Sequence, residues 1–171
     1  MRMFIYIALV VVGLILLIAG TLGIIGSCIP ATHTATMSVT VGMPRDQVWA
    51  LLDDVAAFPT WLPGISKVEM LPDHDGHRVF RQTQGRNSFV LEETVKTPPS
   101  LVTRTITDDN AMFTGSWEHR FEEAGPGRTK ITVNETGTVG SPIPRAIMKI
   151  AFGYDFYLNK FGEALKAKCG S

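Results

Sequence analysis

The feature that most constrains this chain is an uncharged apolar run at its N-terminus. The segment MFIYIALVVVGLILLIAGTLGIIG, Met3–Gly26, contains no charged residue. As a helix rising about 1.5 Å per residue it reaches roughly 35 Å, and the hydrocarbon core of a bilayer is about 30 Å thick. The apolar core of a cleavable signal peptide is only about 7–15 residues long. The run therefore predicts an uncleaved transmembrane anchor over residues 1–28.

A lipoprotein signal is the second interpretation of the same region. The stretch IGSC, Ile25–Cys28, resembles the bacterial lipobox, in which a lipid is attached to the cysteine. Both interpretations tie the rest of the chain to a membrane.

The charges that flank the run predict its orientation. Arg2 is the only charge before it, and Arg45 and Asp46 are the first charges after it. The positive-inside tendency then places the N-terminus in the cytoplasm and the domain outside, as a single-pass protein. Ala19 and Gly23 form a small-xxx-small pair that would support a weak homodimer through the helix, although small residues are common in membrane helices for other reasons.

The rest of the chain, residues 32–171, is long enough for one domain with a real core. The 171 residues include 16 basic and 16 acidic ones with no basic stripe, which argues against a nucleic-acid partner. Cys28 and Cys169 belong to no CxxC or Cys/His cluster, so no zinc site is indicated. The GPGR stretch lacks the spacing of a phosphate-binding loop, and we expect no cofactor.

Alternating residues predict strands through most of this domain. In ATHTATMSVTV, the residues Ala35, Met37, Val39 and Val41 alternate with polar ones and indicate a half-buried first strand. Five or six further strands are expected, roughly at 66–71, 77–84, 88–96, 101–107, 112–122 and 129–139. Turn-forming stretches such as PDHDG and EAGPG separate them, and such short connections predict an antiparallel meander.

Helical patterns flank the strands. GMPRDQVWALLDD predicts a short helix after the first strand, and AAFPTWLPG a second short helix or turn. The segment from Ser141 to Cys169 predicts one long amphipathic helix. Its apolar residues recur at spacings of three and four: Ile143, Ile147, Ile150, Tyr154, Leu158, Phe161 and Leu165. This order predicts an α+β fold, with a curved antiparallel sheet of about six to seven strands wrapped on the long C-terminal helix.

The element order resembles the helix-grip fold of the START-like (SRPBCC) superfamily, and more narrowly the polyketide cyclase/dehydrase and lipid-transport family. The resemblance covers about residues 32 to 168. It rests on VGMPRDQVWALLDDVAAFPTWLPGISKVEML, where Val48, Trp49, Trp61 and Pro63 match the family pattern, and on GSWEHRFEEAGPGRTKITVNETGTV before the final helix. It implies a deep cavity between sheet and helix, suited to a lipid, sterol, quinone or aromatic polyketide. These motifs belong to the fold and carry no catalytic signature.

Turn positions predict which residues face each other across the strands. With Pro98 and Pro99 at one hairpin tip, the expected pairs are Glu93–Arg104, Leu91–Ile106 and Val95–Val102. With Asp109 and Asn110 at the next tip, they are Arg104–Gly115 and Ile106–Phe113. The loop AGPGR gives Trp117–Glu135, His119–Val133 and Gly115–Gly137.

One face of four strands is then expected to carry Glu93, Arg104, His119 and Glu135 among apolar residues. The two glycines leave space over which the guanidinium of Arg104 extends toward Glu135 or Glu93. A buried carboxylate without a partner is costly, so an ion pair with Arg104 is the expected state.

This polar group has a structural and two functional interpretations. It orders the sheet as an ion pair, it orients a ligand head group, or it supplies Glu135 or His119 as an acid/base in a polyketide cyclase/dehydratase-type enzyme. A neighbouring arginine would lower the pKa of Glu135 and weaken it as a base. The anchor, the short tether and the covering helix favour a non-enzymatic module that binds a hydrophobic small molecule or lipid. The expected ligand-binding residues are Glu93, Arg104, Phe113, Trp117, His119, Glu135, Ile147, Tyr154 and Phe161.

Overall fold

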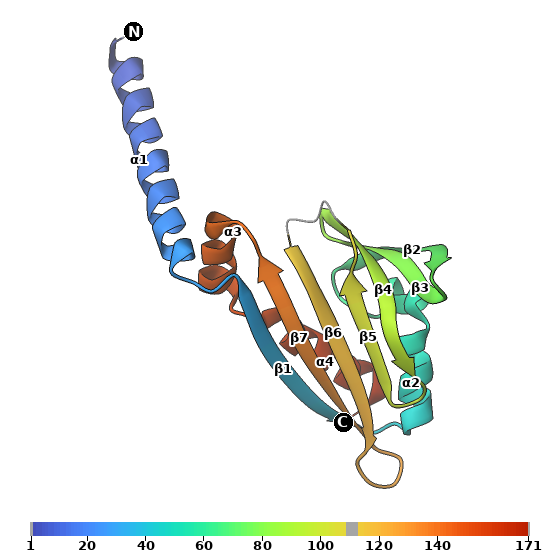
Figure 1. Cartoon of the computed structure of the whole chain (residues 1–171). Helices are drawn as coiled ribbons and strands as arrows, with labels where there is room; N and C mark the ends of the chain where they lie inside the picture. The colour runs from blue at the N-terminus through green and yellow to red at the C-terminus, as the bar shows by residue number, and fades with distance from the viewer. Residues whose placement is uncertain (1, 109–112, 171) are drawn as a thin grey trace.

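A long apolar helix extends away from a curved antiparallel sheet (Figure 1). This computed structural model describes residues 2–108 and 113–170. The first helix, α1 (Arg2–Ser27), is long and apolar enough to cross a membrane, as judged by its length and composition.

The sheet has seven strands, and all neighbouring strands are antiparallel. They are β1 (Thr32–Val41), β2 (Ile65–His74), β3 (His77–Gln84), β4 (Asn87–Thr97), β5 (Leu101–Ile106), β6 (Phe113–Glu123) and β7 (Thr129–Val139). Strands β2 to β7 form the predicted meander, and β1 closes the order by pairing with β7. The predicted fold class is confirmed.

Helices cover the inner, concave face of the sheet at its two sides. The 3-10 helix η1 (Val55–Thr60) follows α2 (Arg45–Asp53) and packs on β2, and α4 (Phe156–Cys169) packs on β1. Strand β1 buries every second residue, including Ala35, Met37 and Val39, as its alternation predicts. The inner faces of the middle strands lie between these two helical covers.

The prediction of one uninterrupted C-terminal helix is wrong. The segment instead forms α3 (Pro142–Ile147), a π-helical turn η2 (Met148–Phe152) and, after a break, α4. Gly153 ends the π-turn with a φ of 70°, in the left-handed region that glycine adopts without strain. The apolar spacing of three and four continues through this break, which is why periodicity alone did not detect it.

Two of the three predicted hairpin registers need correction. The β6–β7 register is confirmed, with Trp117 opposite Glu135. In β4–β5, Glu93 faces Arg104 as predicted, but a bulge after Glu93 pairs Val95 with Thr103 rather than Val102. In β5–β6, Arg104 faces Trp117 rather than Gly115, a shift of two residues that leaves the inner face unchanged. The predicted tip at 109 and 110, and residue 112 of the predicted strand, lie outside the described residues.

The base of α1 is packed directly against the domain. At Gly26 an added Cβ would overlap the carbonyl of Pro142, so only glycine allows α3 this close. Arg145 donates to the carbonyl oxygens of Gly26 at 3.1 Å and Ile29 at 2.8 Å. The same guanidinium donates to Val139 at 3.0 Å and to Gly140 at 2.8 Å. Arg145 therefore caps the end of α1 and joins it to the end of β7.

We expect Arg145→Met to loosen this junction without unfolding the sheet. The substitution removes the guanidinium donors to these four carbonyls while keeping most of the apolar stem. Hydrogen exchange of the full-length chain should become faster in residues 26–31 and 140–145, and stay unchanged in β4 and β6. Unchanged exchange in the first two segments would contradict the role assigned to Arg145.

Candidate functional site

The most connected polar group on the inner face is a network around Glu93. Arg104 donates through Nε at 3.1 Å and Nη2 at 3.0 Å to Oε1 of Glu93. Arg78 donates through Nε at 3.0 Å and Nη2 at 2.7 Å to Oε2, which also lies 3.2 Å from Nζ of Lys96. Arg78 and Lys96 both contact the carboxylate of Asp53 as well. Three cations thus surround two carboxylates.

This network holds Glu93 ionised. Burial opposes ionisation, but the charges of Arg104, Arg78 and Lys96 outweigh it, and the pKa of Glu93 lies below its ordinary value. Arg104 is buried and also donates to the carbonyl of Leu52 at 2.7 Å, and its guanidinium lies over the ring of Phe58 at 5.4 Å. The network therefore fastens the end of α2 to the sheet.

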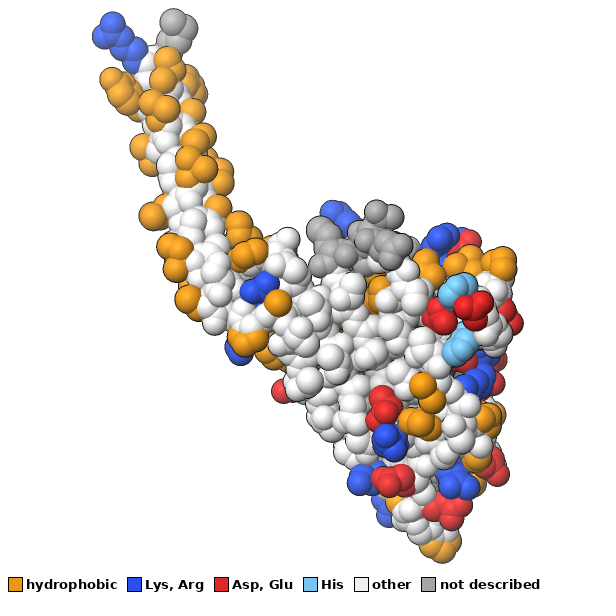
Figure 2. All heavy atoms as spheres, viewed as in Figure 1, with side chains coloured by type: hydrophobic (Ala, Val, Ile, Leu, Met, Phe, Trp, Pro, Cys, Tyr) orange, Lys and Arg blue, Asp and Glu red, His pale blue; other side chains and the backbone are white. Residues whose placement is uncertain are grey.

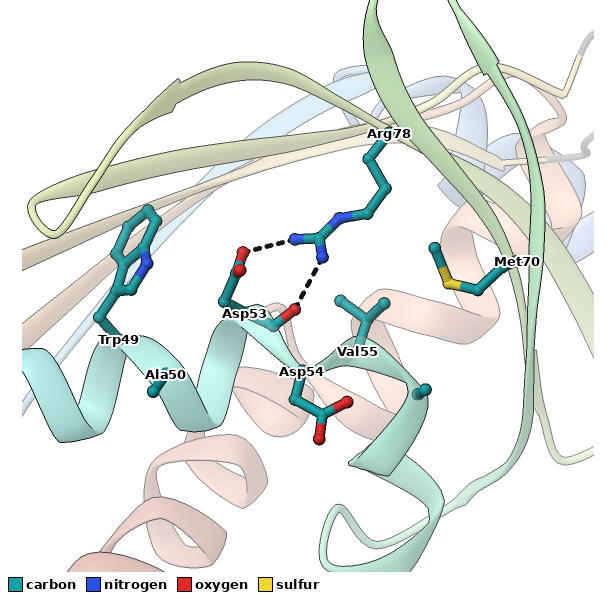
Figure 3. Close-up of a pocket in the computed structure, with 8 residues that line it drawn as sticks. Trp49, Ala50, Asp53, Asp54, Val55, Met70 and Arg78 are labelled. Atoms are coloured by element: carbon teal, nitrogen blue, oxygen red, sulfur yellow. Dashed lines mark hydrogen bonds and ion pairs between the residues drawn. The ribbon is translucent and has the colours of Figure 1, made fainter.

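Two open pockets flank this network on its solvent side. One, of about 380 Å³, lies between α2, η1 and the strands β2 and β3, where Trp49, Asp53, Met70 and Arg78 line it (Figure 3). The second, of about 390 Å³, is lined by the β2–β3 turn together with Arg78, Glu93 and Lys96. Charged residues line both pockets, and neither is lined by the aromatic residues predicted to bind the ligand.

A separate polar cluster surrounds Glu135. The imidazole Nε2 of His33 lies 3.3 Å from Oε1 of Glu135, and the indole Nε1 of Trp117 donates to Oε2 at 2.9 Å. The ring of His33 stacks on Tyr154, with centroids 4.0 Å apart and planes inclined by 8°. His33 and Glu135 are both buried, so the hydrogen bond between them replaces hydrogen bonds to water for both side chains.

Of the two carboxylates expected within reach of Arg104, the ion pair forms with Glu93 and not with Glu135. Arg104 turns toward Glu93 and α2, and the space beside the two facing glycines is taken by other side chains. A Cβ at Gly137 would collide with the rings of His33 and Phe113. The glycines therefore make room for an imidazole from β1 rather than for the arginine.

His119 belongs to neither cluster. It is buried with its ring edge-on to Phe161 at 5.7 Å, and its Nδ1 has no hydrogen-bond partner among the described residues. Burial, reinforced by the charge of Arg104, lowers the pKa of His119 to about 3. The imidazole is therefore neutral throughout the physiological pH range.

The structure distributes the nine predicted site residues over several places. Glu93 and Arg104 lie in the first network. Trp117, Glu135 and Tyr154 lie in the second cluster. The ring of Phe113 lies beside that of Trp117, with their centroids 6.1 Å apart. His119 and Phe161 contact each other. Ile147 is exposed at the end of α3, outside the set that packs on the core.

Sequence reasoning missed several polar members of the two clusters. The alternation of β1 extends back from Ala35 to His33 and was a usable signal for an inward imidazole. Asp53, Arg78 and Lys96 gave no such signal, because each is a charged residue near the end of an element and looks solvent-exposed in sequence.

Several apolar residues pack against the core and remain partly exposed, and they include Trp117 and Tyr154 of the second cluster. They come from the strands, the loop after η1, the segment between η2 and α4, and α4 itself. Among them are Trp61, Ile65, Val68, Phe89, Phe113, Trp117, Tyr154 and Phe161. An apolar lining with a few convergent polar groups is the usual composition of a small-molecule site.

Comparison with known families gives a match over most of the domain. Residues 41–160 match the family described as polyketide cyclase / dehydrase and lipid transport. A search of curated protein sequences found no match.

Solved structures share the fold at low sequence identity. The Zhui aromatase/cyclase from Streptomyces superposes with a TM-score of 0.69 at 17% identity, covering 81% of this chain and 93% of that one. A START superfamily protein from Mycobacterium smegmatis gives 0.68 at 19%, covering 80% and 97%. Truncated norcoclaurine synthase from Thalictrum flavum gives 0.61 at 14%, covering 82% and 95%. At these identities the likeness concerns the fold.

The Glu93 network predicts unequal costs for its two buried partners. Glu93→Gln leaves Arg104 without the only carboxylate that it contacts among the described residues, and should lower the free energy of unfolding by about 3–5 kcal/mol. Arg104→Met should cost less, because Arg78 and Lys96 still neutralise Glu93. The double variant should lose less than the sum of the two.

Urea denaturation of the full-length chain in detergent measures these differences. All three tryptophans lie in the domain, so their fluorescence reports its unfolding rather than that of α1. The matched control is Glu122→Gln on the outer face of β6, which should leave stability unchanged. Additive losses would contradict a coupled buried pair.

His119 predicts a loss of stability in weak acid. Its pKa is about 3 in the folded protein and about 6.5 unfolded, so the unfolded chain binds the extra proton between these values. The contribution of His119 is complete above about pH 6.5 and falls by about 2 kcal/mol between pH 7 and pH 5. His119→Gln should shrink the stability difference between these two pH values by that amount. An unchanged difference would show that His119 titrates normally.

Proposed function

The chain belongs to the polyketide cyclase/dehydrase and lipid transport family, and on this basis we propose that it binds a hydrophobic small molecule at a membrane. The ligand class is a lipid, an isoprenoid or quinone, or an aromatic polyketide. The helix α1 anchors the domain as a single-pass protein, and the flanking charges favour an extracytoplasmic domain.

The observation that carries this proposal is the polar cluster of Glu135 within a partly exposed apolar lining. The ligand's apolar body would lie against Phe113, Trp117 and Phe161, on the inner face between α4 and η1. Its hydroxyl or carbonyl group would meet Glu135 and His33, which already hold each other in place. Burial of the body supplies affinity, and the polar pair supplies orientation.

Simple binding fits the polar residues better than acid/base catalysis by His119. An efficient general acid or base has a pKa near the working pH, and the pKa of His119 is about 3. His119 packs against Phe161 and the hydrophobic core, so its role is in packing.

Glu135→Gln tests the polar end of the site. Loss of a charge-assisted hydrogen bond should lower retention of the ligand roughly tenfold. The full-length chain is purified in detergent, its bound lipids are extracted, and mass spectrometry quantifies them. Lipids that adhere to α1 remain in the control Glu122→Gln, so the difference between the two extracts identifies the ligand of the domain. Identical extracts would contradict a site at Glu135.

A second candidate function is catalysis by Glu135 paired with His33. The carboxylate–imidazole contact of 3.3 Å is the observation that favours it, since such a pair can move a proton. In a cyclase or dehydratase, Glu135→Gln would abolish turnover of a polyketide or lactone substrate while binding persists. In a binding protein the same variant changes retention only.

A further inference from the structure

Exposed apolar side chains form a patch beside the base of α1. We call it the basal patch and define it as Ile143, Ile147, Ile150, Phe152 and Tyr157. Ile150 and Phe152 expose 63% and 47% of their surface. Figure 2 shows hydrophobic side chains along α1 and again where α1 meets the domain. Clusters of this kind on a soluble domain mark a contact with a partner or a membrane.

The basal patch continues the apolar surface of α1. Ile143 packs against α1 beside Gly23, and α3 touches Gly26 through Pro142. A bilayer core takes about 20 helical residues and α1 has 26, so the helix is long enough to cross the core with its last turns in the head-group layer. The patch therefore begins at the depth where α1 would leave the hydrocarbon.

The chemistry of the patch is that of a bilayer interface. Phe152 and Tyr157 form an aromatic cluster with Phe156, with ring centroids 5.2 to 6.5 Å apart. Two lysines lie over rings of this segment, Lys149 at 4.9 Å from the Tyr154 ring and Lys160 at 4.6 Å from that of Phe156. Aromatic rings with lysines whose stems lie along apolar surface are typical of the head-group boundary.

We propose that the basal patch inserts into the interfacial layer of the same bilayer that holds α1, so that the domain lies docked on the membrane. This inference rests on the proposed membrane anchor. The hydrogen bonds from Arg145 to the carbonyls of Gly26 and Ile29 hold α1 against α3 and fix the orientation of the domain relative to α1.

Docking in this way brings the Glu135 cluster next to the lipid. Tyr154 lies between η2 and α4, and its ring stacks on His33, which contacts Glu135. The polar end of the interior is therefore directly behind the patch. A hydrophobic ligand would pass between the leaflet and the inner face at this end, without crossing water.

Site-specific fluorescence in vesicles tests the docking. Cys28 and Cys169 are replaced by Ser and Ala, single cysteines are placed at Ile150 and Phe152, and each is labelled with an environment-sensitive dye. The full-length chain is reconstituted in phosphatidylcholine vesicles with doxyl-labelled lipid as quencher. Val95 on β4, exposed to 45% and thus matched to Phe152, is the control. A label at Leu14 reports whether α1 itself is in the bilayer.

The expected result is quenching of about twofold at Ile150 and Phe152 by shallow doxyl groups, strong quenching at Leu14, and none at Val95. Quenching at Leu14 without any at Ile150 would overturn the docking and leave the anchor intact. Blue-shifted but unquenched emission at Ile150 would overturn it too, because a second copy of the chain or another protein would then cover the patch. Absence of quenching at Leu14 would overturn the anchor, and the docking with it.

Discussion

A buried carboxylate is the constraint on which the arrangement of this domain most depends. Glu93 lies on the inner face of β4, where an unpaired charge would cost several kcal/mol. Its oxygens are satisfied only if Arg104 from β5 and Arg78 from β3 converge on them. These arginines in turn need the carbonyl groups of Leu52 and Asp53. One acidic side chain thereby sets the position of the end of α2 over three strands, and with it one wall of the inner face.

Most elements of the fold follow from local signals, and the features that were missed are one non-local strand pairing and two local irregularities. Alternation and turn residues predicted β2 to β7, and the short loop between β6 and β7 was enough to predict that register. The pairing of β1 with β7 joins residues about a hundred positions apart, and no turn encodes it. The bulge after Glu93 and the break at Gly153 leave the local apolar spacing intact, so pattern reasoning passed over both.

The candidate site was predicted as one polar group and exists as two. Strand parity correctly placed Glu93, Arg104, His119 and Glu135 inside, because parity survives a register shift of two residues. Parity does not say along which direction a long side chain extends. Arg104 pairs with Glu93, and its Nη2 also donates to the carbonyl of Leu52, an acceptor from a helix that strand parity does not predict. His33 became a partner of Glu135 only through the unpredicted pairing of β1 with β7.

The hydrogen bonds of Arg145 to the end of α1 limit how far the domain can move from this helix. A domain on a long flexible linker can move within a volume set by the length of the linker, and such a domain could carry a ligand from one membrane to another. Here the chain from α1 to β1 is only a few residues long, and its carbonyl groups are held by a guanidinium from the domain itself. With α1 in a bilayer, the domain would lie at a fixed distance from the membrane surface and in a fixed orientation to it. A ligand of the proposed site would then be loaded and unloaded at a single membrane, or passed to a second protein that binds the domain.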